Sequence, residues 1–231
     1  MVIVLLPTYN EKDNIEDLVS EITKAAPDLY ILCVDDGSED GTAAILDRLA
    51  KSNPKLSVIH RTGIRGRGIS VKEGLKKAIE RGAGFVIEMD ADFSHDPKYL
   101  PLLLSEMALC DLAIGSRFVK GAKIVGRPWY RNALSILAQV FSRHVMGLRM
   151  KDATSGYRCF KKEALCAIGL DNIESCGPSI VGELNYRIQK KGFKIKEIPI
   201  IFKQRRMGYS KLDMRTLAGC VKTLLRVRFS C

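Results

Sequence analysis

The chain has 231 residues and a formal net charge of +11, and 46% of its residues are hydrophobic. This length can bury one sizeable core and is ordinary for a single α/β domain. Residues 1–114 carry 13 Lys and Arg against 19 Asp and Glu, whereas residues 115–231 carry 24 against 7. We therefore expect the second half to bind an anionic partner, which can be nucleic acid, an anionic membrane face or a phosphorylated substrate.

The seven cysteines include no CxxC pair. An odd number without such a pair argues against a disulfide framework or a zinc site, and it indicates a reduced, cytosolic chain. The apolar run at residues 2–6 lacks the basic segment that opens a secretory signal. No apolar run approaches the roughly 18 residues that a membrane-spanning helix needs.

Apolar runs alternate with segments of helical periodicity in the first half of the chain. The runs predict strands at residues 2–6, 30–34, 56–60, 85–89 and 112–115. Helical spacing between them predicts helices at residues 14–26, 43–51, 71–81 and 100–107. Consecutive strand–helix–strand units predict a mostly parallel sheet that is covered on both faces.

The second half begins with a basic, glycine-containing loop at residues 121–127. After it, we predict helices at residues 129–145, 162–168, 179–191 and 214–229, a polar loop that runs into a short strand at 151–160, and a half-exposed edge strand at 193–201. The helix at 129–145 has a broad apolar face, which can pack on the sheet or lie partly against lipid. The final helix has basic residues beside an apolar stripe, which suits a membrane surface or a core-packed terminal helix.

Two carboxylates follow the fourth predicted strand. Asp90 and Asp92 are two positions apart, so in extended backbone their side chains point the same way and can share one divalent cation with phosphate oxygens. Alternatively, Asp92 or Ser94 only caps the next helix. Other strands also end in polar residues, and the carboxyl ends of parallel strands form the crevice where α/β proteins bind ligands.

Two further loops at this edge carry candidate ligand groups. Asp35 or Asp36, at the end of the second strand, can accept hydrogen bonds from a base or a ribose, while Asp40 and Thr42 can simply cap the next helix. Residues 61–70 combine three glycines with three arginines before a helix, which favours an anion. This loop is neither a Walker loop nor a convincing GxGxxG motif, so it is weak evidence alone.

Several motifs together resemble the family 2 inverting glycosyltransferases, and within them the polyprenol-phosphate sugar transferases. They occur in family order and cover nearly all of the chain. These motifs are Pro7-Thr8-Tyr9-Asn10-Glu11, Val34-Asp35-Asp36-Gly37-Ser38 with Asp40-Gly41-Thr42, Met89-Asp90-Ala91-Asp92 with Ser94-His95, Gly115-Ser116-Arg117, Asp152 to Arg158, and Gly208-Tyr209-Ser210-Lys211.

The resemblance implies one GT-A domain over residues 1–231: a nucleotide-diphospho-sugar transferase fold of the α/β class, with a mostly parallel central sheet flanked by helices. It also implies a nucleotide-sugar donor and Mg²⁺ or Mn²⁺. The donor site would comprise Pro7, Tyr9, Glu11, Asp36 (or Asp35), Asp90, Ala91 and Asp92. Asp90 and Asp92 would hold the metal, with Ser94 at the position of a third ligand.

For the acceptor, the resemblance implies a phosphate site at Arg117, Arg131 and Ser135, and closure over the phosphates by Arg205 and Lys211. Asp92 and Arg117 would be the catalytic residues. One departure is the loop that reads Gly-Leu-Gly-Thr in relatives and Gly66-Arg67-Gly68-Ile69-Ser70 here. The added charges of Arg65 and Arg67 can strengthen diphosphate binding or belong to a different regulatory surface.

The expected reaction moves mannose from GDP-mannose to dolichyl or polyprenyl phosphate with inversion, for protein glycosylation. A phosphate monoester has a second pKa of about 6, so its oxygen is already nucleophilic at neutral pH and no general base is needed. We therefore expect Asp92→Ala to abolish transfer and Glu183→Ala to retain much of it. Glu183 is then a hydrogen-bond partner that joins its helix to the core.

Other activities remain open from the sequence. UDP-glucose or another hexose donor fits the same motifs. A family 2 transferase that acts on a hydroxyl group of a protein or polysaccharide is a second alternative, but it would leave Arg131 and Ser135 without a role. A basic nucleic-acid-binding protein fits the charge, but the chain has no aromatic stacking platform, so we expect no nucleic acid. A sugar nucleotidyltransferase would carry a glycine-rich signature at the first strand, where Pro7-Thr8-Tyr9 stands here.

A lipid acceptor would account for the positive second half. We expect the segments at residues 129–147 and 214–229 to lie at a membrane interface, on the cytosolic face of the endoplasmic reticulum in a eukaryote or of the plasma membrane in a prokaryote. Relatives either continue into transmembrane helices or depend on small membrane-anchoring subunits, so such subunits are possible partners.

Overall fold

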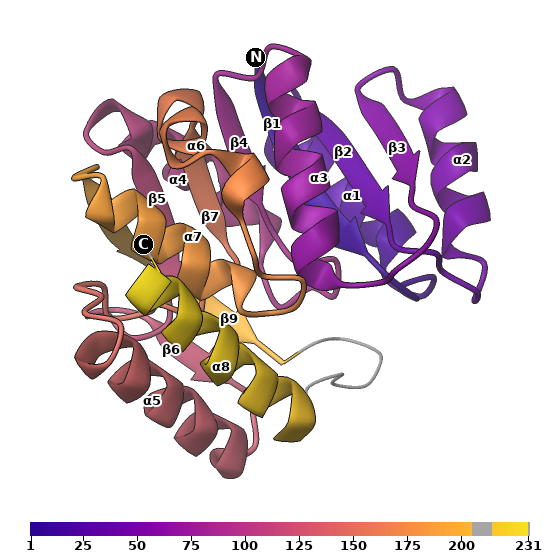
Figure 1. Cartoon of the computed structure of the whole chain (residues 1–231). Coiled ribbons are helices and arrows are strands. Elements are labelled where there is room, and N and C mark those ends of the chain that lie inside the picture. Colours follow the sequence, from indigo (N-terminus) through magenta and orange to yellow (C-terminus); the bar gives the residue numbers. More distant parts are fainter. Residues whose placement is uncertain (205–213, 231) are drawn as a thin grey trace.

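The computed structural model describes residues 1–204 and 214–230 (Figure 1). The strands of its central sheet are β1 (Val2–Thr8), β2 (Tyr30–Asp35), β3 (Leu56–His60), β4 (Phe85–Glu88), β5 (Leu112–Ser116), β7 (Arg158–Lys161) and β8 (Ile195–Pro199). Their order is β3-β2-β1-β4-β7-β5-β8. Only β7 runs antiparallel to its neighbours, β4 and β5. The expected mostly parallel sheet is confirmed.

Helices cover both faces of this sheet. One face packs against α1 (Ile15–Ala25), α2 (Thr42–Ser52) and α4 (Leu100–Ser105). The other packs against α3 (Arg67–Glu80), α6 (Lys162–Ile168) and α7 (Ile180–Lys190). Alternate residues of β1 enter the two cores, with Leu5 on the α3 face and Leu6 on the α1 face. Burial on both sides explains why β1 reads as a continuous apolar run.

The topology gathers loops from both halves of the chain at one edge of the sheet. The parallel strands β1, β2, β4 and β5 all end there. Because β7 is antiparallel, its first residue, Arg158, lies at that same edge and pairs in register with Glu88, the last residue of β4. The polar loop that precedes β7 therefore joins the loops that follow the parallel strands.

Three sequence predictions of local structure differ from the structure. The predicted strand at 193–201 is two strands: β8 forms the sheet edge as expected, but after Pro199 the chain leaves it and β9 (Ile201–Lys203) pairs with β6 (Lys123–Val125). The predicted loop at 121–127 contains β6, which is too short for a periodic pattern. The predicted helix at 100–107 is α4 between two 3₁₀ turns, η1 (Pro97–Tyr99) and η2 (Glu106–Ala108).

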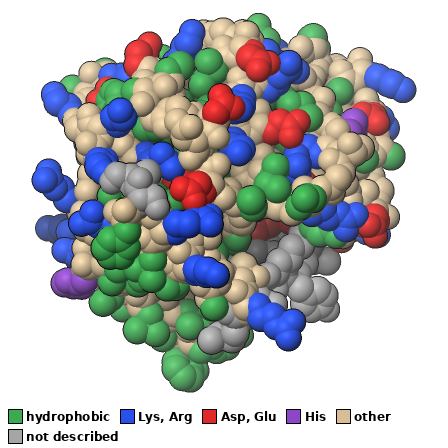
Figure 2. All heavy atoms as spheres, in the orientation of Figure 1, with side chains coloured by type: hydrophobic (Ala, Val, Ile, Leu, Met, Phe, Trp, Pro, Cys, Tyr) green, Lys and Arg blue, Asp and Glu red, His purple; other side chains and the backbone are tan. Residues whose placement is uncertain are grey.

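The helix α5 (Trp129–His144) is turned with much of its apolar surface outward. Its buried residues are polar: Ser135, Gln139 and Ser142. Six large apolar side chains of α5 are exposed, namely Trp129, Tyr130, Leu134, Ile136, Leu137 and Val140, and the basic Arg143 and His144 at its end are exposed as well. In Figure 2 hydrophobic side chains gather at the lower end of the molecule, where Figure 1 shows α5. Phe141 alone packs partly against the core of the α3 face.

The final helix, α8 (Met214–Ser230), packs on α7. Leu224 and Val227 are buried, and Leu224 lies against Gly182 of α7. Val221 and Phe229 are exposed. This helix therefore combines core packing with outward apolar residues. Among residues 1–204 and 214–230, no helix has both the length and the apolar content needed to cross a bilayer.

Gly74 allows α3 to approach β1 and β2 closely. A Cβ atom at Gly74 would stand 2.3 Å from Leu5 Cδ1 and 3.0 Å from Val34 Cγ2. We therefore predict that Gly74→Ala lowers the free energy of unfolding by about 1–3 kcal/mol through overpacking. Urea unfolding of the purified protein measures this.

The matched control is Gly219→Ala in α8, where a Cβ atom would meet nothing within 4 Å beyond the backbone of its own helix. Alanine has the higher helix propensity, so this variant should gain up to about 1 kcal/mol. Equal stability changes in the two variants would contradict close packing at Gly74.

Candidate active site

Hydrogen bonds join the loops after β1 and β2 into one unit. The Asn10 N–H donates to Ser38 Oγ at 2.9 Å, and the Glu39 N–H donates to Asn10 Oδ1 at 3.0 Å. Asp40 Oδ1 accepts from the Thr42 N–H, but Gly41 stands at the N-cap of α2 and Thr42 is the first residue of the helix, so neither Asp40 nor Thr42 is its N-cap. Asn10 has a φ of 53°, a left-handed conformation that asparagine tolerates better than most residues.

The residues expected around a base and ribose lie in this unit. The Tyr9 hydroxyl accepts from Arg65 Nη1 at 2.9 Å, and the Arg65 guanidinium lies over the Tyr9 ring. Glu11 Oε2 accepts from Asn14 Nδ2 at 2.8 Å. Pro7 is partly exposed near the end of β1. The ring of Tyr9 and the carboxylate of Glu11, which follow β1, therefore belong to the same hydrogen-bonded unit as the acidic residues between β2 and α2.

Asp35 and Asp36 have different partners. The Ser38 side chain and N–H both donate to Asp35, so Asp35 supports its own loop. Asp36 accepts from the Gly66 N–H at 2.7 Å and from the Arg61 guanidinium. Asp36 therefore connects the loop after β2 to the start of α3.

The glycines of the loop before α3 allow a close approach of protein backbone. Cβ atoms at Gly66 and Gly68 would each stand 2.3 Å from a carbonyl oxygen, of Cys176 and Ser175 respectively. Their N–H groups donate to Asp36 and to the Cys176 carbonyl. Gly66 and Gly68 therefore make room for a neighbouring loop, and their N–H groups already have protein acceptors.

Asp90, Ala91 and Asp92 follow β4 directly, and the turn after them is strained. Asp92 Oδ1 accepts from the Ser94 N–H at 3.0 Å, and Phe93 between them has a φ of 63°. A left-handed phenylalanine costs about 1–3 kcal/mol and is typical of functional sites. The helical turn after this motif is capped by Asp96, whose Oδ1 accepts from the Lys98 N–H. The alternative that Asp92 or Ser94 serves as this cap is therefore wrong.

A buried ion network lies behind Asp90. Arg67 Nη2 donates to Asp90 Oδ1 at 2.7 Å and to Glu88 Oε1 at 3.0 Å. Glu88 Oε2 accepts from Arg158 Nη2 at 2.5 Å, and neither Glu88 nor Arg158 is exposed. Arg158 also donates to the Asn185 side chain on α7. The sequence reasoning missed this network, although a glutamate inside an apolar strand is a signal for a buried partner.

His95 is central to the site, although the sequence reasoning assigned it no role. Its Nδ1 accepts from the Asp90 N–H at 3.0 Å, its ring stacks on Tyr157, and Phe202 lies at its edge. Burial lowers the pKa of His95, against the opposing effect of the Asp90 and Asp92 carboxylates. The imidazole is therefore neutral at pH 7, with its proton on Nε2.

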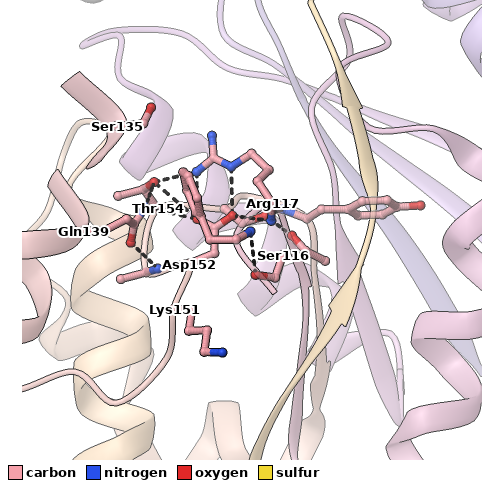
Figure 3. A network of polar contacts seen from close by, with 12 residues as sticks. Ser116, Arg117, Ser135, Gln139, Lys151, Asp152 and Thr154 are labelled. Atoms are coloured by element: carbon pink, nitrogen blue, oxygen red, sulfur yellow. Dashed lines mark hydrogen bonds and ion pairs between the residues drawn. The ribbon is translucent and has the colours of Figure 1, made fainter. Parts of the chain in front are cut away.

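Arg117 is held rigidly on the second side of the site (Figure 3). Its Nε and Nη2 donate to the two carboxylate oxygens of Asp152 at 2.8 and 2.7 Å, and Nη2 also donates to Thr154 Oγ1. Gln139 of α5 donates to Thr154 and Asp152, and Glu197 of β8 accepts from the Asp152 N–H. Asp152 is fully buried, so its charge depends on these donors.

Arg127 contacts Ser135, which was expected to contact an acceptor phosphate, and Arg117 and Arg131 lie near Arg127. Arg127 Nη1 donates to Ser135 Oγ at 2.8 Å. The guanidinium groups of Arg117 and Arg127 both lie over the Phe202 ring, at 5.3 and 5.7 Å from its centroid. Burial lowers the pKa of Arg127, as do the charges of Arg117 and Arg131. Such a cluster favours an anion.

Arg127 is a site residue that the sequence reasoning missed, because it appeared only as one charge in a basic loop. The two sides of the site meet at Phe202, which contacts His95 as well as Arg117 and Arg127. Arg205 and Lys211, expected to close over the phosphates, lie outside the described residues, as does the motif at 208–211.

Comparison with known proteins identifies the class. Residues 3–169 match the family model described as glycosyl transferase family 2, and the chain belongs to this family. The resemblance of its motifs to that family is therefore confirmed. The fold comparison agrees: the crystal structure of Mycobacterium tuberculosis glucosyl-3-phosphoglycerate synthase with Mn²⁺, UDP and phosphoglyceric acid superposes with a TM-score of 0.71 at 17% identity, covering 99% of this chain and 78% of that one. The expected GT-A fold is confirmed.

Closer relatives share much more sequence. The chain is 41% identical to polyprenol monophosphomannose synthase of Mycolicibacterium smegmatis, over 91% of this chain and 80% of the relative. It is 39% identical to undecaprenyl-phosphate mannosyltransferase of Micrococcus luteus, over 97% and 93%. It is 36% identical to dolichol-phosphate mannosyltransferase of Pyrococcus furiosus, over 97% of this chain and 62% of that longer protein.

Glu183 has the structural role that the sequence analysis preferred. It is fully buried on α7, and its carboxylate accepts from the N–H groups of Glu174 and Ser175 and from Arg187 Nε. The loop that it holds contains Cys176, whose carbonyl accepts from the Gly68 N–H of α3. Glu183 therefore supports the start of α3 from behind.

We predict that Glu183→Ala lowers the free energy of unfolding by about 3–5 kcal/mol, because Arg187 and two backbone donors lose a buried acceptor. Chemical denaturation measures this. The control is Glu163→Ala on α6, an exposed position where the cost should stay below about 1 kcal/mol. A Glu183→Ala protein of unchanged stability and no activity would instead indicate a catalytic carboxylate.

Proposed function

We propose that this protein transfers mannose from GDP-mannose to the phosphate of dolichol or another polyprenol, with inversion. The observation that carries the proposal is one site with two sides of opposite charge, of which one suits a cation and the other suits an anion. One has the carboxylate pair Asp90 and Asp92, and the other has the arginine cluster beside Ser135. All three relatives are named for the transfer of mannose to a polyprenol phosphate or for the synthesis of its product. These names support a polyprenyl phosphate as the acceptor.

The donor side suits a nucleoside diphosphate and a divalent cation. Pro7, Tyr9, Glu11 and Asp36 would contact the base and ribose, and Ala91, which is buried in the core of the α1 face, would adjoin the donor only through its backbone between Asp90 and Asp92. Within the described part of the chain, no three or more His, Cys, Asp or Glu side chains converge as a metal centre. Two carboxylates plus substrate phosphates are, however, a common set of ligands for Mg²⁺, and Mn²⁺ accepts the same oxygen donors.

The residues Asp90 and Asp92, with Ser94 near them, would hold Mg²⁺ or Mn²⁺. When bound, the cation neutralises charge on the leaving diphosphate. The Mycobacterium tuberculosis structure, which contains Mn²⁺ and UDP in the same fold, supports a divalent cation here. Asp92 is the catalytic residue proposed on this side.

The acceptor side suits a phosphate monoester. Arg117, Arg131 and Ser135 would bind it, and Arg127 joins them because it already contacts Ser135. Asp152 orients Arg117, the catalytic residue proposed on this side, so that its remaining N–H groups can face the phosphate. Arg205 and Lys211 would close over the phosphates. The nucleophilic oxygen is already ionised near neutral pH, so these residues need only align it and offset its charge.

A lipid acceptor gives the outward apolar face of α5 a partner. The polar inner face of α5 supplies Ser135 and Gln139 to the acceptor side, while its outer face carries Trp129 and Leu137. We propose that residues 129–147 and 214–229 lie at the cytosolic face of a membrane, with or without small anchoring subunits. The surplus of Lys and Arg in the second half favours anionic lipid. Residues 1–231 would then act as one catalytic domain.

The decisive assay combines GDP-mannose or UDP-glucose with undecaprenyl phosphate and Mn²⁺, and it detects lipid-linked sugar by mass spectrometry. We expect product from GDP-mannose, and Asp92→Ala should lower kcat/KM by about 10²-fold or more. The control is Asp28→Ala, at a fully exposed side chain, which should match the wild type. Product from UDP-glucose alone would overturn the donor assignment, and no product from either donor would overturn the proposed function.

Vesicle flotation tests the membrane surface. We predict that Leu137→Glu lowers binding to vesicles of phosphatidylcholine and phosphatidylglycerol by about tenfold or more, because burying a leucine contributes about 1.5–3 kcal/mol. Leu109→Glu is the control, since Leu109 is as exposed as Leu137 but lies outside α5, and it should bind like the wild type. Equal losses in the two variants would contradict docking through α5.

A further inference from the structure

Arg67 takes the place at the Asp90 carboxylate that the proposed function assigns to a cation. It is the first residue of α3, and its Nη2 lies 2.7 Å from Asp90 Oδ1. Its side chain is 26% exposed and that of Asp90 is 35% exposed, so both reach the open side of the site. Arg67 thus pairs with Asp90, one of the two carboxylates that follow β4. This pair is the solvent-accessible end of the ion network that continues to the buried Glu88 and Arg158.

Gly156 leaves the room that the Arg67 guanidinium occupies. A Cβ atom at Gly156 would stand 2.6 Å from Arg67 Nη2 and 3.5 Å from Asp90 Oδ1. This glycine belongs to the loop before β7, which the antiparallel direction of that strand brings to the site. The pairing of Arg67 with Asp90 therefore depends on a residue that is distant in the sequence.

The network can release Arg67 without leaving a buried charge unpaired. Arg67 contacts Glu88 through Oε1, while Arg158 holds Glu88 through Oε2. If Arg67 turns away, the fully buried Glu88 keeps the fully buried Arg158 as its partner. Asp90, in contrast, would exchange the Arg67 guanidinium for another cation.

Repulsion between Arg67 and a divalent cation determines how the two can share Asp90. A cation on Asp90 and the Arg67 guanidinium repel each other at such short range. A diphosphate removes the conflict, because its oxygens can accept from the guanidinium and bind the cation as well. The backbone N–H groups of Gly66 and Gly68 already have protein acceptors, and among the arginines of this loop Arg67 is the one paired with Asp90, so its side chain is suited to that contact.

We propose that Arg67 is the counter-ion of Asp90 in the donor-free enzyme and moves to the diphosphate of the donor when donor and cation bind together. Cation binding is then weak without nucleotide and strong with it. Arg67 is a donor-binding and positioning residue that couples the two ligands. This inference rests on the proposed function for the identity of the donor, but its first test needs no nucleotide.

The test measures Mn²⁺ affinity by electron paramagnetic resonance of the free ion, with no nucleotide present. Arg67→Met keeps much of the side-chain length and removes the charge, so it should bind Mn²⁺ about tenfold more tightly than the wild type, a usual size for such coupling. Gly156→Ala displaces the guanidinium without removing it and should change the affinity in the same direction. Arg48→Met is the control, because Arg48 lies exposed on α2 and pairs with Glu16, and it should stay within about twofold of the wild type.

A second arm measures the binding of GDP, and of UDP in parallel, at saturating Mn²⁺ by isothermal titration calorimetry. Arg67→Met should bind GDP about tenfold more weakly, because the diphosphate loses the guanidinium. Unchanged nucleotide-free Mn²⁺ affinity in both Arg67→Met and Gly156→Ala would overturn the counter-ion role. Weakened Mn²⁺ binding in Arg67→Met would overturn it as well.

The outcomes separate this inference from the proposed function. A tenfold Mn²⁺ gain with no binding of either nucleotide to the wild type would support the competition for Asp90 and overturn the nucleotide-sugar donor. Thermal unfolding by circular dichroism confirms that each variant is folded. If Arg67→Met does not fold, Gly156→Ala provides the same comparison with the arginine retained, and an unchanged Mn²⁺ affinity in it overturns the inference.

Discussion

The ion pair between Glu88 and Arg158 is the constraint on which the rest of the site depends. Both side chains are fully buried, so each charge is tolerable only while the other is present. The pair lies across β4 and β7, where the parallel part of the sheet meets its one antiparallel strand. Through Arg158 it reaches Asn185 on α7, and through Glu88 it reaches Arg67 on α3. The carboxylate motif that follows β4 is therefore positioned relative to both helices by one buried interaction.

A second buried charge, that of Asp152, governs the acceptor side in the same way. Asp152, which is fully buried, orients Arg117, and Gln139 of α5 donates to Asp152 and Thr154. The inner face of α5 is polar because it completes this network, which leaves its apolar residues on the outside. A helix with this reversed pattern needs an apolar partner, and the proposed lipid acceptor provides one. The inner face of α5 would then position the acceptor site, and its outer face would dock on the membrane.

Much of the site could be predicted from local sequence. Strand ends carry Asp36, Asp90, Asp92 and Arg117, and the parallel topology inferred from alternating elements brings them to one edge. Partners that come from distant segments could not be predicted in this way. Arg127 belongs to the site only because β6 pairs with β9 and places it over Phe202. The role of Gly66 and Gly68 could not be predicted either, because they serve the close approach of Ser175 and Cys176, which lie far away in the sequence.

The sequence by itself determined the family, the α/β alternation and the positions of the candidate ligands, because apolar periodicity and short motifs are local properties of the chain. The tertiary structure alone decided which charges are neutralised and by which partners. It placed Arg67 on Asp90, Arg158 on Glu88 and Asp152 on Arg117, and it turned the apolar face of α5 outward. These outcomes depend on contacts between residues far apart in the chain, and on burial, which makes an unpaired charge too costly to leave.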